Sequence, residues 1–235
     1  DGVIDGSNGE SKAGQAVLID KGVIAQVGEA ESVRNESPHD TIAIDLAGAT
    51  LCPGLIDGHT HLSLAGDGRN YDEMFSETDE MMVMTGTMNM IKHLQAGITT
   101  IREHGARNRV GFALKEGLQR GYIPGPRMQV SGRPITCTGG HFWVCNEEAD
   151  GEEEIRKSVR RLVHEGADYI KIMASGGKTS SLTRWGQDIM QNKITFKNAD
   201  GTEYQIMFKK PDKRVADNAD GWCTSPYSIK PRILI

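Results

Sequence analysis

Two histidines, His59 and His61, stand one residue apart at the end of a short apolar run in the segment LCPGLIDGHTHL, residues 51–62. The apolar run is typical of a buried strand, and residues i and i+2 of a strand point to the same side. Two imidazoles on one side of a strand end can bind one cation, and zinc binds histidine nitrogen readily. Taken alone, the pair leaves two interpretations equally open, a metal site and two ordinary loop histidines.

Four further residues bear on this site. Gly54 and Gly58 permit tight backbone turns beside the histidines. Asp57 is placed either to accept a hydrogen bond from a metal-binding imidazole or to close a local turn with the backbone. His141, in the segment TGGH, follows another predicted strand and is a candidate substrate-binding residue at the same edge, with an ordinary loop histidine as the alternative.

The first 50 residues predict a small β unit. The apolar runs QAVLID (15–20) and VIAQVG (23–28) flank the turn Asp20-Lys21-Gly22, which predicts a hairpin. The segment TIAIDLAGATLCPG, residues 41–54, predicts another alternating run with a glycine turn.

From residue 54 onward, predicted strands alternate with predicted helices. The strands fall in 54–61, 97–105, 125–132 and 167–177, and the helices in 76–97, 110–121 and 151–166. This alternation indicates a parallel sheet with helical crossovers. Four such units with candidate ligands at the carboxyl ends of strands favour an α/β fold containing half of a TIM-like (β/α) barrel.

The first of these helices is rich in methionine. Ser76 and Asp79 form a plausible capping box, and Gly97 suits the position after the helix. A face containing Met81, Met84, Met88 and Ile91 has helical spacing and is predicted to fill the core.

The alternation stops after Gly177. The segment ITFKNADGTEYQIMF, residues 194–208, predicts a hairpin around residues 198–201, and the remainder has no clear period. We expect residues 178–235 to be an atypical tail, either a fused piece or the product of a shifted reading frame.

Composition excludes several functional classes. The chain has 235 residues, 37% of them hydrophobic and 25% charged, with a formal net charge of −5. No basic patch predicts nucleic-acid binding, and no apolar stretch is long enough to predict a membrane span. The four cysteines, Cys52, Cys137, Cys145 and Cys223, are widely spaced. That spacing favours free thiols in a reducing compartment, so the location stays unknown with the cytoplasm favoured.

Four segments together carry a family resemblance: PGLIDGHTHL (53–62), LQAGITTIREHGA (94–106), GPRMQVSGRPITCTGGH (125–141) and GADYIKIMASGG (166–177). In this order and spacing the chain resembles the metal-dependent amidohydrolase superfamily, in its imidazolonepropionase-related and Xaa-Pro dipeptidase-like branch. The resemblance implies a hydrolase that acts on carbon–nitrogen bonds of small amide, dipeptide-like or cyclic amide substrates through metal-activated water. It also divides the chain into a small β domain (1–52), a half-barrel (53–177) and the tail (178–235).

The resemblance gives Lys171, in YIKIMASGG, a specific role. In relatives, a lysine at this strand end is carboxylated and bridges two divalent metals, most often zinc, so the implied metal ligands are His59, His61 and Lys171. Carboxylation turns a cation into an anionic oxygen ligand and requires a neutral amine, which burial near other cations favours. Without the resemblance, a lysine extending to solvent is the better interpretation.

The resemblance is incomplete. Complete relatives take one histidine from each of strands five and six and an aspartate from strand eight, whereas the last histidine here is His164. Relatives commonly carry aspartate where this chain has Glu103, and we assign that residue no role. We therefore expect a chain truncated after the fourth barrel strand and name no catalytic residue. The alternative is a non-catalytic fragment with at most weak metal binding, and an oligomer is left open.

Overall fold

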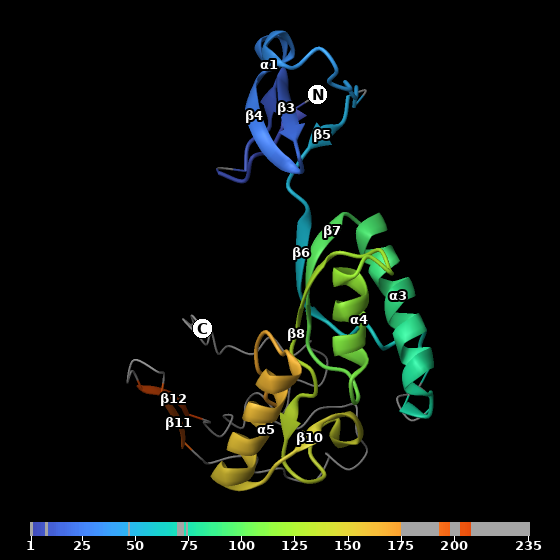
Figure 1. Cartoon of the computed structure of the whole chain (residues 1–235), viewed down its shortest axis with the longest axis vertical. Helices are drawn as coiled ribbons and strands as arrows, with labels where there is room; N and C mark the ends of the chain where they lie inside the picture. The colour runs from blue at the N-terminus through green and yellow to red at the C-terminus, as the bar shows by residue number, and fades with distance from the viewer. Residues whose placement is uncertain are drawn as a thin grey trace.

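The amino-terminal unit of the computed structural model is a small β structure. The structure describes residues 2–7, 9–46, 48–69, 73 and 75–174, and the backbone of 193–197 and 203–207. Strands β1 (Gly2–Val3), β2 (Lys12–Ala13) and β5 (Thr50–Leu51) form one sheet in the order β2-β1-β5. Helix α1 (Ala30–Glu36) lies against the hairpin of β3 and β4 (Figure 1).

The predicted hairpin of this unit is confirmed. Strands β3 (Gln15–Asp20) and β4 (Val23–Glu29) pair antiparallel. Lys21 and Gly22 join them with φ angles of 50° and 77°, the left-handed conformation that matches the twist of paired strands.

The alternating run predicted for residues 41–54 forms a strand only at β5 (Thr50–Leu51). Residues 41–46 lie outside the strands of the described chain, and Ile42 and Ile44 are 86% and 80% exposed. Alternating side chains favour a strand only where a neighbouring strand takes up the backbone hydrogen bonds, and the β3–β4 hairpin does not supply that edge here.

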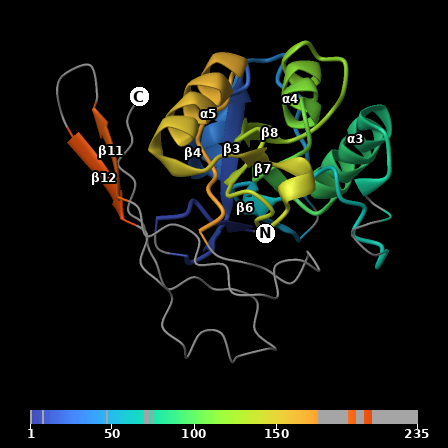
Figure 2. The same cartoon turned by 90° about the horizontal axis from the view of Figure 1, so that it is seen from below.

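The second unit is a parallel sheet with helical crossovers. Strands β6 (Leu55–Thr60), β7 (Ile98–Glu103) and β8 (Arg127–Val130) pair in the order β6-β7-β8. Helix α3 (Asp79–Gln95) connects the first two strands, α4 (Val110–Gln119) connects the next two, and α5 (Gly151–Glu165) follows. Figure 2 shows the three helices in an arc around the strands, so the predicted alternation and a mixed α/β fold are confirmed.

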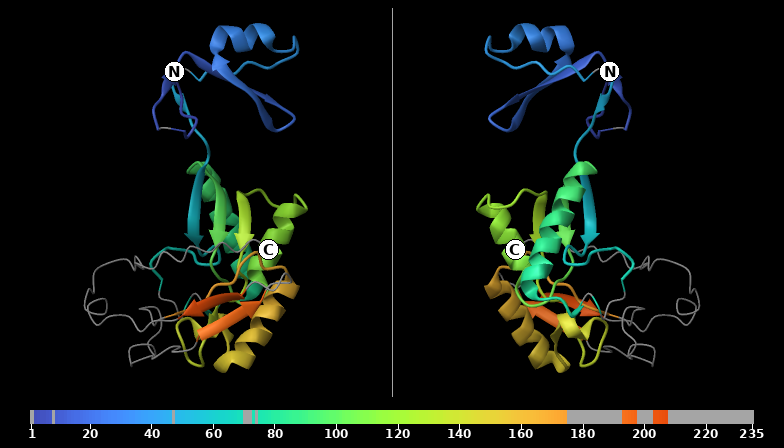
Figure 3. Two further views of the ribbon diagram at one scale, coloured as in Figure 1. Left: turned by 90° about the vertical axis from the view of Figure 1, so that its left-hand side faces the viewer. Right: turned by 90° about the vertical axis from the view of Figure 1, so that its right-hand side faces the viewer.

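The three strands end at the same level. Thr60 pairs with Glu103, and Glu103 pairs with Val130, after an irregularity in β6 between Asp57 and Thr60. The residues that follow the strands therefore gather at one edge of the sheet, at the end away from the amino-terminal unit (Figure 3).

The fourth predicted strand does not form as a regular element. Residues 168–173 run beside β8 and its continuation through single backbone bonds, from Asp168 N to Val130 O (2.8 Å) and from Met173 N to Ile135 O (2.9 Å). Between β8 and β9 (Ile135–Thr136), the left-handed Gly132 and the N–H-lacking Pro134 interrupt the ladder. β9 instead pairs in parallel with β10 (Glu147–Glu148), on either side of a 3-10 turn at Trp143–Cys145.

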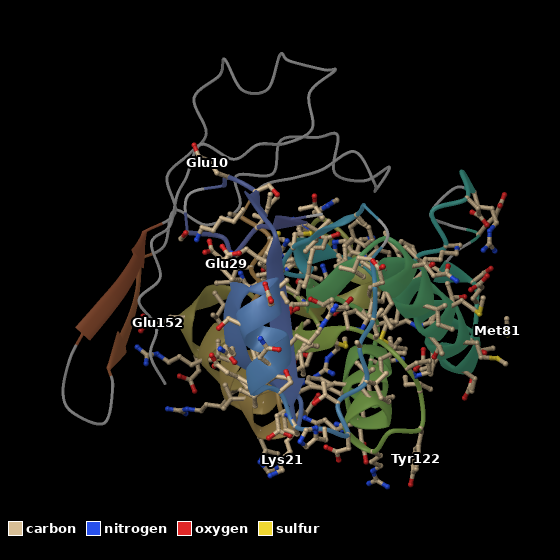
Figure 4. The ribbon with its side chains drawn as sticks, turned by 90° about the horizontal axis from the view of Figure 1, so that it is seen from above. Glu10, Lys21, Glu29, Met81, Tyr122 and Glu152 are labelled. Carbon is tan, nitrogen blue, oxygen red and sulfur yellow. The ribbon has the colours of Figure 1, made fainter. Side chains whose placement is uncertain are left out.

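Helix α3 buries a different face from the one predicted. Met82, Gly86 and Met90 are buried, whereas Met81 and Met84 are 48% and 63% exposed, and Met81 lies at the periphery of the molecule (Figure 4). The phase is set by close packing on α4, because a Cβ at Gly86 would lie 2.5 Å from Leu114 Cδ1. Thr78, not Ser76, caps the helix, and its hydroxyl accepts from the backbone N–H of Met81.

The core consists of two clusters on the helical side of the sheet. One gathers around Leu62, Met82, Met90, Ile101 and Leu114, and the other around Phe112, Val130, Ile135, Ile155 and Leu162. Together they fix α3, α4 and α5 against the strands whose ends carry the candidate site.

The hairpin predicted in the tail is confirmed, since β11 (Lys193–Lys197) pairs antiparallel with β12 (Glu203–Met207). The other residues of the tail lie outside the described residues. Within the described part of the chain, no helix combines the length and apolar character needed to cross a membrane.

Leu114→Ala tests the core. Leu114 is fully buried between α3 and the sheet, so its truncation leaves a cavity and should lower the free energy of unfolding by about 2–5 kcal/mol in urea titrations. The control Met84→Ala removes a 63% exposed side chain. It should change stability by less than about 0.5 kcal/mol. Equal effects from the two variants would contradict the observed phase of α3.

Candidate metal centre

His59 and His61 lie side by side at the end of β6, with their ring centroids 5.4 Å apart. His61 Nδ1 lies 3.1 Å from the carbonyl oxygen of Gly105, which can only accept a hydrogen bond. The hydrogen of the neutral ring is therefore on Nδ1, and Nε2 keeps a free lone pair. This is the arrangement found for metal-binding histidines, whose other nitrogen donates to a backbone carbonyl or a carboxylate.

Lys171 reaches the same place from the far end of the described unit. Its Nζ lies 3.5 Å from His59 Nε2, although the two residues are 112 positions apart. Burial is the largest influence on the lysine and lowers its pKa, Glu103 opposes this shift, and Arg102 adds to it. The surroundings therefore favour a neutral amine more than water does.

The imidazoles of this region are held neutral. Burial, ahead of the other influences, lowers the pKa of His61 to about 4, with the Gly105 hydrogen bond opposing and Lys171 adding to the shift. Burial followed by Lys171 also lowers the pKa of His59, and lowers that of His141 to about 4. Neutral imidazole is the form that binds metals, so the electrostatics suit a ligand set.

His141 lies near the pair, and the ring of Phe142 contacts both His141 and His61. The Phe142 ring stacks parallel to His61 at 6.2 Å and meets His141 edge-on at 4.7 Å. Phe142 itself has φ 59°, an uncommon left-handed conformation for an aromatic residue. A small pocket beside His61 is lined by residues including Leu64, Phe75, Phe142, Asn146 and Met173.

Asp57 takes the local turn role. Its Oδ1 accepts from the backbone N–H of His59 at 2.9 Å, and its Oδ2 lies 3.7 Å from His93 Nε2. Asp57 thus shapes the bend that presents His59, and the imidazole that its carboxylate approaches is that of His93.

The structure adds a third imidazole that the sequence analysis missed. The His104 ring meets His59 edge-on with centroids 4.3 Å apart, and its Nδ1 lies 2.5 Å from the Tyr169 hydroxyl. That hydroxyl donates to the Glu103 carbonyl at 2.6 Å, so it accepts from the Nδ1–H of His104. The signal was the position of His104 directly after a strand that pairs with the one bearing His59.

Glu103 was also passed over. It is fully buried, and burial raises its pKa to about 8 against the opposing effects of the Gly105 N–H and Lys171. Its Oε2 accepts from the backbone N–H of Gly105 at 3.0 Å. An acid at the end of an apolar strand is a signal that sequence alone offers, but its partner is visible only in the fold.

The donor set fits a metal only in part. Among the described residues, no group of three or more His, Cys, Asp or Glu side chains is arranged to hold a metal ion. The structure brings the imidazoles of His59, His61 and His104 close to Lys171, and of these groups His61 has a defined free Nε2 and Lys171 has a lowered pKa. These groups fit a nitrogen-binding cation such as zinc as part of a ligand set.

A family model described as the amidohydrolase family matches residues 50–193, more than half of the chain. The chain belongs to the amidohydrolase family. The matched range contains every residue of the candidate centre, from His59 to Lys171.

Individual relatives agree with this assignment. The amidohydrolase chain is 28% identical over 207 residues to ochratoxinase of Aspergillus niger, covering 76% of this chain and 42% of that protein. It is 29% identical over 126 residues to imidazolonepropionase of Halobacterium salinarum, covering 45% of this chain and 30% of that protein. The crystal structure of a prolidase complexed with N-methylphosphonate-L-proline superimposes with a TM-score of 0.64 at 28% identity, covering 76% of this chain and 46% of that one. The chain thus spans less than half the length of these relatives.

The neutral imidazoles predict a specific dependence of stability on pH in metal-free protein. Burial is the main cause that lowers the pKa of His104 to about 3 in the folded chain. In the unfolded chain this histidine has a pKa of about 6.5, so between these two values only the unfolded chain binds the proton. Stability should therefore fall as pH drops from about 7 to 5, where carboxylates with ordinary pKa values stay charged. Glu103, whose folded pKa is about 8, opposes this trend by one proton.

His104→Gln isolates the contribution of this residue. The urea midpoint of His104→Gln, measured with a chelator present, should fall less between pH 7 and pH 5 than that of the unchanged protein. The reason is that one titrating group has been removed. His164→Gln, which alters an exposed histidine at the end of α5, is the matched control. An unchanged slope in His104→Gln would show that this imidazole is not held neutral.

Proposed function

We propose that this amidohydrolase uses a divalent cation, with zinc favoured, to hydrolyse carbon–nitrogen bonds in small amide, dipeptide-like or cyclic amide substrates. The observation that carries the proposal is the meeting of Lys171 and His59 at 3.5 Å, beside the tautomer-fixed His61. Members of the family generally use divalent metals, which supports a metal role for these nitrogen donors.

Under this proposal His59 and His61 would hold the cation through imidazole nitrogen, and Lys171 would hold it as a carbamate. The neutral amine attacks carbon dioxide, a nitrogen–carbon bond forms as one carbon–oxygen π bond breaks, and one proton passes from the nitrogen to water. The product carries an anionic oxygen in place of a cation. The lowered pKa of Lys171 supports this step, because only the unprotonated amine reacts.

A bound divalent cation would polarise a substrate carbonyl and lower the pKa of water. The chain's own residues then position the substrate. Phe142 and Phe75 contact each other edge-on at 5.2 Å and line the pocket beside His61, so they shield that side from water and suit an apolar substrate group. We assign His141, which contacts Phe142, to the substrate.

The proposal includes an architecture. We place residues 1–52 in a small β domain and residues 53–177 in the first units of a (β/α) barrel, whose strand ends carry the site. We assign residues 178–235 to a tail on the sequence pattern alone. The level strand ends of β6, β7 and β8 and the path of residues 168–173 beside β8 support the barrel.

The names of the relatives support a small substrate. Imidazolonepropionase and ochratoxinase are similar chains, and the prolidase structure holds a small proline derivative.

A second candidate function is favoured by the lack, among described residues, of a third His, Cys, Asp or Glu ligand. In that case the chain binds a metal weakly and turns over no substrate.

Zinc affinity measured by isothermal titration calorimetry tests the proposal. The unchanged chain should bind zinc, and His59→Ala, His61→Ala and Lys171→Met should each weaken binding by about tenfold or more. Labelled bicarbonate should add a carbamate signal in NMR that is lost in Lys171→Met. His164→Ala, which removes an exposed histidine outside the site, is the control and should bind zinc as the unchanged chain does.

Equal zinc binding by His61→Ala and His164→Ala would refute the metal centre. Turnover separates the two functions once metal binding is established. Appearance of a new amine from aminoacyl-prolines, N-acyl amino acids or cyclic amides with zinc-loaded protein supports the hydrolase, and zinc binding without turnover supports the alternative.

A further inference from the structure

We propose that Glu103 is a positioning residue, which holds the Gly105 carbonyl against His61 and so fixes the orientation and tautomer of that imidazole. The proposal rests on the proposed metal centre for its purpose. Its geometry stands on contacts within the chain. Neither the family comparison nor the sequence analysis gave Glu103 a role.

Glu103 closes a turn at the end of its strand. Glu103 ends β7 and is fully buried, and its Oε2 accepts from the N–H of Gly105 at 3.0 Å. The side chain thereby ties down the residue two positions ahead, at the point where the chain leaves the sheet.

Gly105 itself has a constrained conformation. Its φ is 135°, and a Cβ on it would lie 2.3 Å from Pro134 Cγ and 2.6 Å from Pro134 Cδ. A side chain is excluded at Gly105. The Glu103 carboxyl group holds the peptide on the amino side of Gly105, and the bond from Ala106 N–H to Gly132 O (3.3 Å) holds the peptide on its carboxyl side. Gly105 is thus held at both of its peptides, and its carbonyl accepts from His61 Nδ1 at 3.1 Å.

The carboxyl group of Glu103 is only half satisfied by hydrogen bonds. The second carboxyl oxygen of Glu103, Oε1, is buried and has no hydrogen-bond partner in the described structure. A buried polar atom without a partner costs stability, and an apolar side chain of similar length would avoid that cost. The Gly105 N–H requires an oxygen acceptor at this position, which an apolar side chain cannot supply.

The same residue also reaches the second imidazole through its backbone. The Glu103 carbonyl accepts from the Tyr169 hydroxyl, which in turn accepts from His104 next to His59. Both histidines of the proposed centre are thus linked to the end of β7, one through the side chain of Glu103 and one through its main chain.

Ring-nitrogen NMR of histidine-labelled, metal-free protein at neutral pH tests the proposal. The His61 signals are assigned by their loss in His61→Gln. In the unchanged chain and in Glu103→Gln, which keeps an acceptor for Gly105, His61 should carry its proton on Nδ1. In Glu103→Met, which keeps length without an acceptor, His61 should populate both tautomers. Zinc affinity should fall about 10–100-fold in Glu103→Met and recover in Glu103→Gln.

An unchanged Nδ1-protonated His61 in folded Glu103→Met overturns the positioning role. Glu103→Leu replaces Glu103→Met if the latter does not fold, with the same expected tautomer mixture, and thermal unfolding identifies folded variants. The tautomer measurement needs no metal. If the unchanged chain binds no zinc while the tautomers shift as expected, the proposed function fails and the positioning role stands.

Discussion

The level pairing of three parallel strands is the constraint on which the site depends. Thr60, Glu103 and Val130 lie in one row across β6, β7 and β8, so the next residues along each strand arrive at the same edge. A one-residue slip of β7 would turn its side chains to the opposite face and remove Glu103 from the turn beside His61. The register is fixed by the core, in which Ile101 and Val130 are fully buried beneath the helices.

Burial at this edge gives the site its chemical character. Four imidazoles and a lysine lie close together at this edge, and all five have lowered pKa values. If these groups were protonated, their positive charges would repel one another. The fold therefore gives up some stability toward acid in order to keep nitrogen lone pairs available. Hydrogen bonds from His61 to Gly105 and between His104 and Tyr169 then select which nitrogen of each ring carries the hydrogen.

Local patterns in the sequence were enough to predict most of the elements. Period-two and helical spacing, with glycines such as Gly97 and Gly166 after helices, predict the strand–helix order, because these signals act within one turn or one strand. The phase of α3 could not be predicted in this way, since methionines occur on both of its faces and the contact of Gly86 with Leu114 selects one. Similarly, the interruption at Gly132 and Pro134 decides that residues 168–173 form bridges and not a full strand.

The candidate site was predictable only where a motif marked it. His59, His61 and Lys171 were expected from spacing and family resemblance, and the structure places the lysine beside the first histidine. His104 escaped because its partner Tyr169 is 65 positions away and meets it only after the sheet has formed. Glu103 escaped although its partner Gly105 is only two residues ahead, because the burial of its carboxyl group arises only in the folded chain. Contacts and burial of this kind leave little trace in one sequence.

X-ray absorption spectroscopy of the chain loaded with one equivalent of zinc in bicarbonate buffer is the most direct test of the central claim. The account predicts a first shell of nitrogen and oxygen at about 2.0–2.1 Å, with the multiple-scattering pattern of two imidazoles. A shell of oxygen alone, or one containing sulfur, would contradict a centre built from His59, His61 and Lys171.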